Sequence, residues 1–228
     1  RLGEPVIRRA VSAAMREMGE QFVLGRTIDE AIKRGREFSR KGYTYSFDML
    51  GEAARTEADA LRYHEAYADA ITTLAATATS KEIAENHGIS VKLSALHPRY
   101  EAIQAEKTLP VLAERLLSLA LAARNAGIGL NVDAEEADRL DLSLEVIERV
   151  LSDPGLNGWD GFGVVVQAYG TRAGYVIDWL YALAQTLDRK IMVRLVKGAY
   201  WDTEIKRAQV LGLSGYPVFT RKRNTDIS

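Results

Sequence analysis

The sequence predicts an α/β protein built on a (β/α)₈ barrel, of which about six of the eight units lie in this chain. Short runs rich in Val, Ile and Leu alternate with helical stretches, and this alternation is typical of a parallel sheet covered by helices. Polar residues come at the end of one predicted strand after another, as they do at the catalytic end of a barrel. No Gly-x-Gly-x-x-Gly motif follows the first strand, which argues against a dinucleotide-binding sheet.

Residues 1–41 are expected to form a helical segment that precedes the barrel at 42–228. Pro5 suits the first turn of a helix that continues over Val6–Phe22. The segment Thr27–Glu30 matches a capping box, which predicts that a second helix begins there. The aromatic run Tyr43–Phe47 then alternates as a strand does and is the first predicted strand.

The remaining predicted elements alternate along the chain. The strands are short apolar runs at Ile89–Leu93, Leu130–Asp133, Gly163–Gln167, Ile191–Val196 and, as a shorter sixth strand, Pro217–Thr220. The helices are Thr56–Ala78, Thr108–Asn125, Leu142–Ser152, Ala173–Leu187 and Asp202–Leu211. A barrel of this kind needs about 250 residues, so we expect its last two units to lie outside this chain.

The composition excludes several kinds of site. The chain has 228 residues, a formal net charge of −1, three histidines and no cysteine. Disulfides, thiolate metal sites and a cysteine nucleophile are therefore excluded, a reducing cytoplasm is compatible, and no metal site is expected. The balanced charge gives no reason to expect nucleic-acid binding. The longest apolar stretches, such as Leu116–Ala123, are too short for a transmembrane helix.

The segment Met192–Trp201 is the most informative in the chain. Arg194 lies among apolar residues in a predicted buried strand. Burying a guanidinium is unfavourable unless it is paired, so Arg194 is expected to have an anionic or polar partner. A protein carboxylate and a bound cofactor or substrate both remain open at this point.

Polar residues follow or end all six predicted strands. In strand order they are Asp48 with Glu52, Lys92, Asp133, Gln167, Arg194 with Lys197, and Thr220 with Arg221. Because the carboxyl ends of parallel barrel strands meet at one end of the barrel, we expect these side chains to build the site.

Several longer stretches carry a family resemblance. They are Tyr45–Ala54, Val91–Tyr100, Asn131–Asp138, Gly163–Tyr169, Met192–Trp201 and Tyr216–Lys222. In this order they resemble the proline dehydrogenase barrel of bacterial bifunctional proline utilization proteins. The resemblance implies a flavoenzyme that binds FAD noncovalently, oxidises L-proline to Δ1-pyrroline-5-carboxylate and passes the electrons to a membrane quinone.

The same resemblance implies a cytoplasmic protein that associates peripherally with the inner face of the cytoplasmic membrane. In the whole protein, a separate aldehyde dehydrogenase domain outside this chain would use NAD to carry the product on to glutamate. A homo-oligomer is compatible with the family, and no nucleic-acid partner is expected for this segment.

For the cofactor, the resemblance implies that Arg194 lies near flavin N5, where its charge would stabilise the reduced ring, with Asp133 orienting it. Gln167 would meet the pyrimidine edge of the flavin. The other residues expected near FAD are Val196, Lys197, Gly198, Ala199 and Trp201, and, at the ribityl-phosphate or adenosine part, Thr220, Arg221 and Lys222. A structural ion pair, a glutamine bonded to backbone, a plain strand-to-helix turn and a solvated loop are the respective alternatives.

For the substrate, Lys92 would bind the proline carboxylate, with a structural pair to Asp48 or Asp133 as the alternative. Asp48 is grouped with the substrate pocket, and Tyr200 would pack against the pyrrolidine ring. Glu52 resembles a glutamate that pairs with an arginine on the final barrel helix, beyond this chain. We therefore expect the chain to hold much of the flavin pocket and an unfinished substrate pocket, so that a protein ending here would bind FAD weakly and not turn over.

Two other functions remain open. A Schiff-base aldolase on the same barrel would use Lys92 or Lys197 as its nucleophile and would need no flavin. A non-catalytic barrel domain would keep the fold for regulation or scaffolding.

Overall fold

The computed structural model describes residues 23–50 and 53–228, together with residues 4, 7–9, 11, 12, 15 and 19. The predicted helix Val6–Phe22 therefore lies largely outside the described residues. The chain divides into two compact units, Arg1–Tyr45 and Ser46–Ser228.

In the first unit, the predicted second helix is confirmed as α2 (Ile28–Ser39). The hydroxyl of Thr27 accepts a hydrogen bond from the backbone N–H of Glu30 at 3.2 Å. The Glu30 carboxylate accepts one from the backbone N–H of Arg26 at 2.9 Å. The reciprocal bond of the expected capping box thus reaches one residue further back, and the first turn of the helix is still capped.

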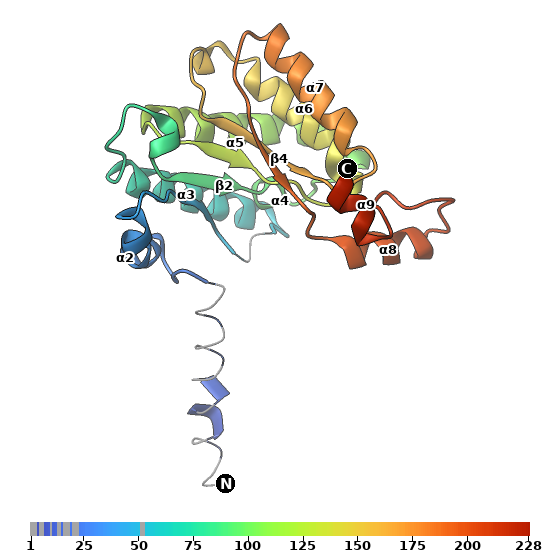
Figure 1. Ribbon diagram of the computed structural model, residues 1–228, viewed down its shortest axis with the longest axis horizontal. Helices are drawn as coiled ribbons and strands as arrows, with labels where there is room; N and C mark the ends of the chain where they lie inside the picture. The colour runs from blue at the N-terminus through green and yellow to red at the C-terminus, as the bar shows by residue number, and fades with distance from the viewer. Residues whose placement is uncertain are drawn as a thin grey trace. The chain divides into compact units, whose positions relative to one another are not determined.

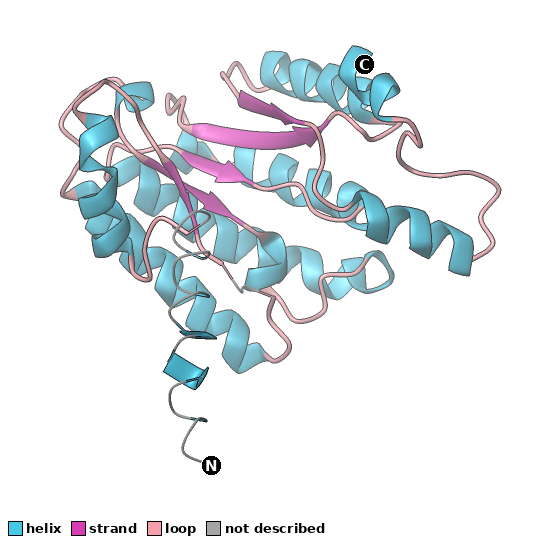
Figure 2. Ribbon diagram, turned by 60° about the horizontal axis from the view of Figure 1, so that its bottom comes forward, coloured by secondary structure: helices cyan, strands magenta, loops and turns pink. Residues whose placement is uncertain are grey.

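The second unit is a parallel sheet of five strands that pair in sequence order. The strands are β1 (Ser46–Asp48), β2 (Gly88–Val91), β3 (Leu130–Val132), β4 (Phe162–Gln167) and β5 (Met192–Val196). Right-handed crossovers between neighbouring strands in this order place the connecting helices on one face of the sheet, as Figure 2 shows. The α/β class and the start of the barrel pattern are therefore confirmed.

The connecting helices match the predicted helical stretches. They are α3 (Glu57–Ala75), α5 (Ala105–Asn125), α6 (Leu140–Leu151), α7 (Ala173–Thr186) and α8 (Trp201–Val210). Two short helices, α4 (Leu93–Leu96) and α9 (Lys222–Ile227), and four 3₁₀ turns, η1 (Ile83–Glu85), η2 (Ala102–Gln104), η3 (Ala137–Arg139) and η4 (Pro154–Leu156), complete the unit. In Figure 1, α8 and α9 lie toward the end of the sheet where α4 follows β2.

The core of this unit lies between the sheet and the helices. Fully buried residues include Ile89 of β2, Leu130 of β3, Leu74 of α3 and Leu116 of α5. Over the described residues, every helix falls short of the combined length and apolarity that a membrane-spanning segment requires.

The predicted sixth strand, Pro217–Thr220, is wrong. Val218 makes an isolated antiparallel bridge to Gly170, and the backbone N–H of Phe219 donates to the carbonyl of Tyr169 at 2.7 Å. The segment is too short for a ladder of its own, and its backbone groups find partners in the turn after β4. Its apolar residues have the composition of a strand, but in the folded structure the segment does not form one.

The expectation that β5 is buried on both faces is also wrong. Val193 and Leu195 are 44% and 58% exposed, whereas the alternate residues of the strand are half-buried. Within the described residues β5 pairs only with β4, so it is an edge strand. Lys92, expected inside β2, comes directly after it as the residue that precedes α4.

Candidate functional site

Side chains from the ends of four strands meet on the face of the sheet opposite the helices. Residues two apart in a strand share a face, so Ser90 and Lys92 lie on one side of β2 while Ile89 and Val91 pack into the core. Arg194 of β5, which lies opposite Val165 of β4 in the strand register, is on the same side of the sheet as Ser90 and Lys92. We call this the inner face of the sheet.

Asp48, Lys92, Asp133 and Arg194 form a charge cluster on the inner face. Lys92 Nζ donates to Asp48 Oδ1 at 2.6 Å and to Asp133 Oδ2 at 3.0 Å. Arg194 NH2 donates to the other oxygen of Asp133, at 2.5 Å. Asp133 is the centre of the cluster, because it joins a cation from β5 to the cation that follows β2. The structural pairs expected as alternatives for Lys92 and Arg194 are thus both present.

The charge cluster is balanced and only partly buried. The Asp133 side chain is 10% exposed and the Lys92 side chain 19%, while the Arg194 side chain is 40% exposed. Burial raises the pKa of the Asp133 carboxyl above its ordinary value, and the charges of Lys92 and Arg194 oppose that rise. The exposed part of Arg194 leaves its guanidinium accessible to a ligand. No group of three or more His, Asp or Glu side chains within the described ranges is arranged to hold a metal ion.

The turn between β5 and α8 has a backbone that only glycine fits comfortably. Gly198 has a φ of +134°, and a Cβ added there would come within 2.5 Å of ring atoms of Tyr169. The hydroxyl of Tyr169 accepts a hydrogen bond from the backbone N–H of Tyr200 at 3.3 Å. Burial raises the pKa of Tyr169 to about 12, so its hydroxyl stays protonated and neutral at physiological pH. Tyr169 thus packs its ring against Gly198 and bonds its hydroxyl to the backbone of Tyr200, and both contacts hold the turn in place.

Gln167 links this turn to the loop after β3. Its Oε1 accepts from the backbone N–H of Ala199 at 2.9 Å, and its Nε2 donates to the carbonyl of Glu135 at 3.0 Å. A side-chain amide has two N–H groups and two acceptor lone pairs, so these two backbone bonds leave hydrogen-bonding capacity for a ligand.

The other predicted cofactor residues lie at the exposed margin of the site. Lys197 and Lys222 both pair with Asp226, at 3.2 and 2.5 Å. Trp201 is 41% exposed, and its Nε1 donates to the carbonyl of Phe219 at 2.9 Å. Thr220 and Arg221 are exposed and Val196 and Tyr200 are half-buried, whereas Glu52 lies outside the described residues.

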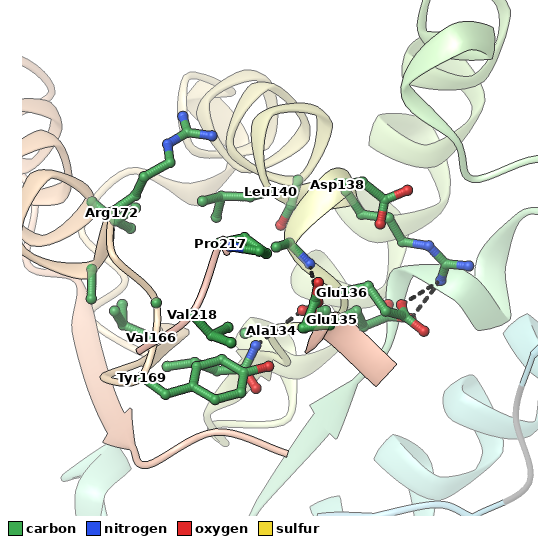
Figure 3. A pocket seen from close by; sticks show the side chains of 18 of the residues that line it. Ala134, Glu135, Glu136, Asp138, Leu140, Val166, Tyr169, Arg172, Pro217 and Val218 are labelled. Atoms are coloured by element: carbon green, nitrogen blue, oxygen red, sulfur yellow. Dashed lines mark hydrogen bonds and ion pairs between the residues drawn. The ribbon is translucent and has the colours of Figure 1, made fainter. Parts of the chain in front are cut away.

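A cavity of about 300 Å³ lies between the helix-facing side of the sheet and helices α6, α7 and α8. Figure 3 shows Tyr169, Val166 and Val218 on one side of it and Glu135 and Glu136 on another. Its walls also include Val132, Val164, Leu144, Ala208 and Leu213. Of the predicted site residues only Asp133 and Gln167 line it, so the cavity is largely separate from the charge cluster.

Among the residues that sequence reasoning missed are Ser90 of the inner face and Tyr169 beside the turn. Ser90 is fully buried, and its Oγ accepts from Arg194 NH1 at 3.1 Å. The available signal was a polar residue between Ile89 and Val91 in an otherwise apolar strand. Tyr169 gave no such signal, because an aromatic residue after a strand is most simply explained by core packing.

Comparison with known proteins identifies the family of this chain. The family model described as "Proline dehydrogenase" matches residues 31–228. The bifunctional protein PutA of Rhizobium meliloti is 57% identical over 228 residues, which are all of this chain and 18% of that protein. A crystal structure of a mutant PutA from Bradyrhizobium japonicum, 58% identical, superposes on the whole chain with a TM-score of 0.85, and the match covers 23% of that structure. PutA from Bdellovibrio bacteriovorus, 28% identical, gives a TM-score of 0.90 over 97% of this chain and 24% of that structure. The chain spans less than a fifth of the length of the Rhizobium meliloti protein. Because the family model covers most of it, the chain belongs to the proline dehydrogenase family.

Proposed function

We propose that the protein containing this chain oxidises L-proline to Δ1-pyrroline-5-carboxylate with FAD bound at the carboxyl end of the sheet. The single observation that carries the proposal is the charge cluster, which places an accessible arginine beside a buried carboxylate in a chain of this family. The experiment that tests it is the response of the bound chromophore to L-proline, set out below.

The residues at this end of the sheet fit a flavin nucleotide. Gly198 and Ala199 follow β5, the strand that carries Arg194, with main chain that has no bulky side chains, so a planar ring can approach closely there. Arg221 and Lys222 are exposed nearby at the start of α9, where they could meet a phosphate group. Gln167 has the donor and acceptor groups that a pyrimidine edge needs. When bound, the flavin would accept a hydride from the carbon next to the proline nitrogen.

Arg194 is proposed to stabilise the negative charge that develops in this reaction. Its guanidinium is held by Asp133 before any ligand arrives, and a preorganised charge of this kind does not have to reorient during the reaction. The Asp133 carboxylate orients Arg194. Lys92 contacts both Asp133 and Asp48, so the two positive charges of the cluster balance its two negative charges.

Lys92 is proposed to bind the carboxylate of proline. Its ammonium donates to Asp48 and Asp133, and its positive charge is what a carboxylate ligand would meet. An incoming carboxylate would compete most easily with Asp48, whose side chain is 41% exposed, whereas that of Asp133 is only 10% exposed. Tyr200 is proposed to pack against the pyrrolidine ring.

The aldolase alternative is not favoured by the same geometry. A Schiff-base lysine must present an unprotonated amine to a carbonyl, whereas Lys92 contacts two carboxylates and Lys197 pairs with Asp226 at the exposed margin. The non-catalytic alternative is addressed by the activity test.

The test uses the intact protein, because this chain covers only part of the length of its relatives. The visible absorption spectrum is recorded before and after anaerobic addition of L-proline, and bleaching of flavin bands is expected. Arg194→Met should reduce flavin affinity or the rate of bleaching sharply without loss of fold, since it removes the positive charge but keeps much of the apolar stem. Arg149→Met, at an exposed arginine of α6 that is not a member of the charge cluster, is the matched control.

A colourless protein, or a flavin that L-proline leaves oxidised, would count against the proposed function. An independent probe is available, because the PutA structure from Bdellovibrio bacteriovorus is described as inactivated by N-propargylglycine. We expect the same compound to inactivate this protein and L-proline to protect it.

The proposal extends to the cellular context of the reaction. The electrons are proposed to pass to a membrane quinone, with the protein in the cytoplasm and peripherally bound at the inner face of the membrane. The second activity in the name of the bifunctional relatives is proposed to belong to an NAD-dependent aldehyde dehydrogenase domain elsewhere in the intact protein. Proline-dependent reduction of a soluble quinone analogue, co-sedimentation with vesicles and proline-dependent glutamate formation with NAD test these three points separately.

A further inference from the structure

Beneath the charge cluster, three small polar residues form a hydrogen-bonded floor. Ser46 of β1 and Ser90 of β2 bring their hydroxyl oxygens within 2.8 Å of each other, and Asn131 Nδ2 of β3 donates to Ser46 Oγ at 3.3 Å. Arg194 NH1 donates to Ser90 Oγ at 3.1 Å. We call Ser46, Ser90 and Asn131 the polar floor. It connects the first three strands of the sheet to Arg194 on the fifth.

Either hydroxyl of the Ser46–Ser90 pair can be the donor, and one of the two directions is cooperative with the bond to Arg194. A guanidinium has only donors, so Ser90 must be the acceptor in its bond with Arg194. Asn131 donates to Ser46, and Ser90 can then donate its own hydroxyl hydrogen to Ser46. A hydroxyl that donates one hydrogen bond becomes a better acceptor for another. With Ser90 as the donor to Ser46, the floor strengthens the contact that Ser90 makes with Arg194.

The two terminal nitrogens of Arg194 are held by different partners. NH2 bonds to Asp133 at 2.5 Å and NH1 to Ser90. A guanidinium fixed at both terminal nitrogens cannot rotate about its Cδ–Nε axis without breaking a contact. Asp133 supplies the charge that attracts Arg194, and Ser90 supplies the second point that sets the plane of its guanidinium.

The space for the floor depends on a glycine of β4. Gly163 lies opposite Asn131 in the register, and a Cβ added at Gly163 would come within 2.0 Å of Asn131 Oδ1. Ser90 itself is 0% exposed. A buried hydroxyl in an otherwise apolar strand is unfavourable without hydrogen bonds, and here its partners are Arg194 and Ser46.

We infer that Ser90 is a positioning residue, which sets the orientation of the Arg194 guanidinium toward the substrate and flavin. The inference rests on the proposed function, since it assigns Ser90 a part in that reaction. It predicts an effect on the chemical step and on the relative stability of oxidised and reduced flavin. A hydroxyl that served only to stabilise the strand would change neither.

The test compares Ser90→Ala with Thr108→Val in the intact protein. Thr108 is also 0% exposed, and its hydroxyl donates to the carbonyl of Arg99, so its loss removes a buried hydrogen bond remote from Arg194. The measurements are thermal melting, the limiting rate of flavin reduction at saturating L-proline, the KM for proline, and the reduction potential of the bound flavin.

For Ser90→Ala we expect the limiting rate to fall about fivefold to tenfold, with the KM changed by less than about twofold, because the interaction is made chiefly in the transition state. An equal, fivefold to tenfold, loss in the stabilisation of reduced relative to oxidised flavin would make the two-electron potential of the flavin about 20 to 30 mV more negative, since tenfold corresponds to about 30 mV. Thr108→Val should melt at a lower temperature but keep the wild-type rate and potential.

The inference is overturned if Ser90→Ala keeps the wild-type potential and rate, or if Thr108→Val changes them equally. If L-proline fails to reduce the flavin of the wild-type protein, the proposed function fails on that result, while the potentials of the variants still decide whether Ser90 acts through Arg194. Should Ser90→Ala not fold, Ser46→Ala removes the next hydroxyl along the chain of bonds. It is expected to slow reduction about twofold to threefold, and an unchanged rate and potential in that variant would equally reject the inference.

Discussion

Replacing Gly198 with alanine tests how strictly the turn after β5 is specified. The φ of +134° is a conformation that costs a residue with a side chain about 1–3 kcal/mol. The new Cβ would also come within 2.6 Å of three Tyr169 ring atoms, well inside the contact distance of about 3.5–4.0 Å. Relieving such an overlap typically costs about a further 1–3 kcal/mol. We therefore expect Gly198→Ala to lower the free energy of unfolding by about 2–6 kcal/mol.

The matched control for this variant is Gly212→Ala. Gly212 also has a positive φ, +63°, but a Cβ added there meets nothing within 4 Å. It should therefore lose only the conformational part, about 1 kcal/mol. Because a displacement of about 1 Å in a positioned group can cost about 100-fold in rate, Gly198→Ala should also lose proline oxidation and flavin content, which Gly212→Ala should keep. Denaturant unfolding, flavin absorbance and steady-state kinetics measure the three effects. Equal stability and equal flavin content in the two variants would refute the reasoning.

Three further predictions concern single side chains. Lys92→Met should raise the KM for proline by about tenfold or more with a smaller change in kcat, and an unchanged KM in steady-state kinetics would reject carboxylate binding. Asn86→Ala should destabilise the fold by about 2–4 kcal/mol in denaturant unfolding, because the buried amide serves four backbone groups, those of Thr79, Ser80 (twice) and Gly127; a loss below about 1 kcal/mol would contradict this. Burial raises the pKa of the Glu204 carboxyl in the folded state above the ordinary value of 4.5. The folded state therefore keeps the carboxyl proton to higher pH than the unfolded state does. The free energy of unfolding consequently falls as the pH rises from 4.5 through the folded pKa. Glu204→Gln should therefore lose less stability between acidic and neutral pH than the wild type, and parallel stability–pH curves would show that Glu204 does not titrate as described.

The fold could be predicted from sequence where local pattern and tertiary environment agree. Thr56 and Asp59 form the complete capping box that begins α3, and the apolar run Phe162–Gln167 is a strand buried at five of its six positions. The segment Pro217–Thr220 has the same local character, but its partner is the turn after β4. A local pattern cannot identify a partner about 50 residues away, so the pattern of this segment alone predicts a strand.

In the candidate site, too, some residues can be predicted from the sequence and others cannot. The sequence predicts Lys92, Asp133 and Arg194 at one end of the sheet because the carboxyl ends of parallel barrel strands meet there, and the structure brings them into contact. Ser90 was missed because a small hydroxyl is common both in sites and in cores. Its significance depends on the distance to Arg194, which only the folded sheet determines. The proposed roles of these residues toward FAD and proline remain predictions.

The sequence separations within the charge cluster have a consequence for how this protein folds. Arg194 and Ser90 are 104 positions apart, Arg194 and Asp133 are 61 apart, and Lys92 and Asp48 are 44 apart. Contacts at such separations close large loops, whose entropy must be offset before the contacts form. The cluster can assemble only after all five strands have reached their final register, so it is expected to form late in folding. Any ligand that binds the assembled cluster would then shift the equilibrium away from partly folded states of the whole sheet, so the supply of such a ligand would help to determine how much of the protein reaches the folded state.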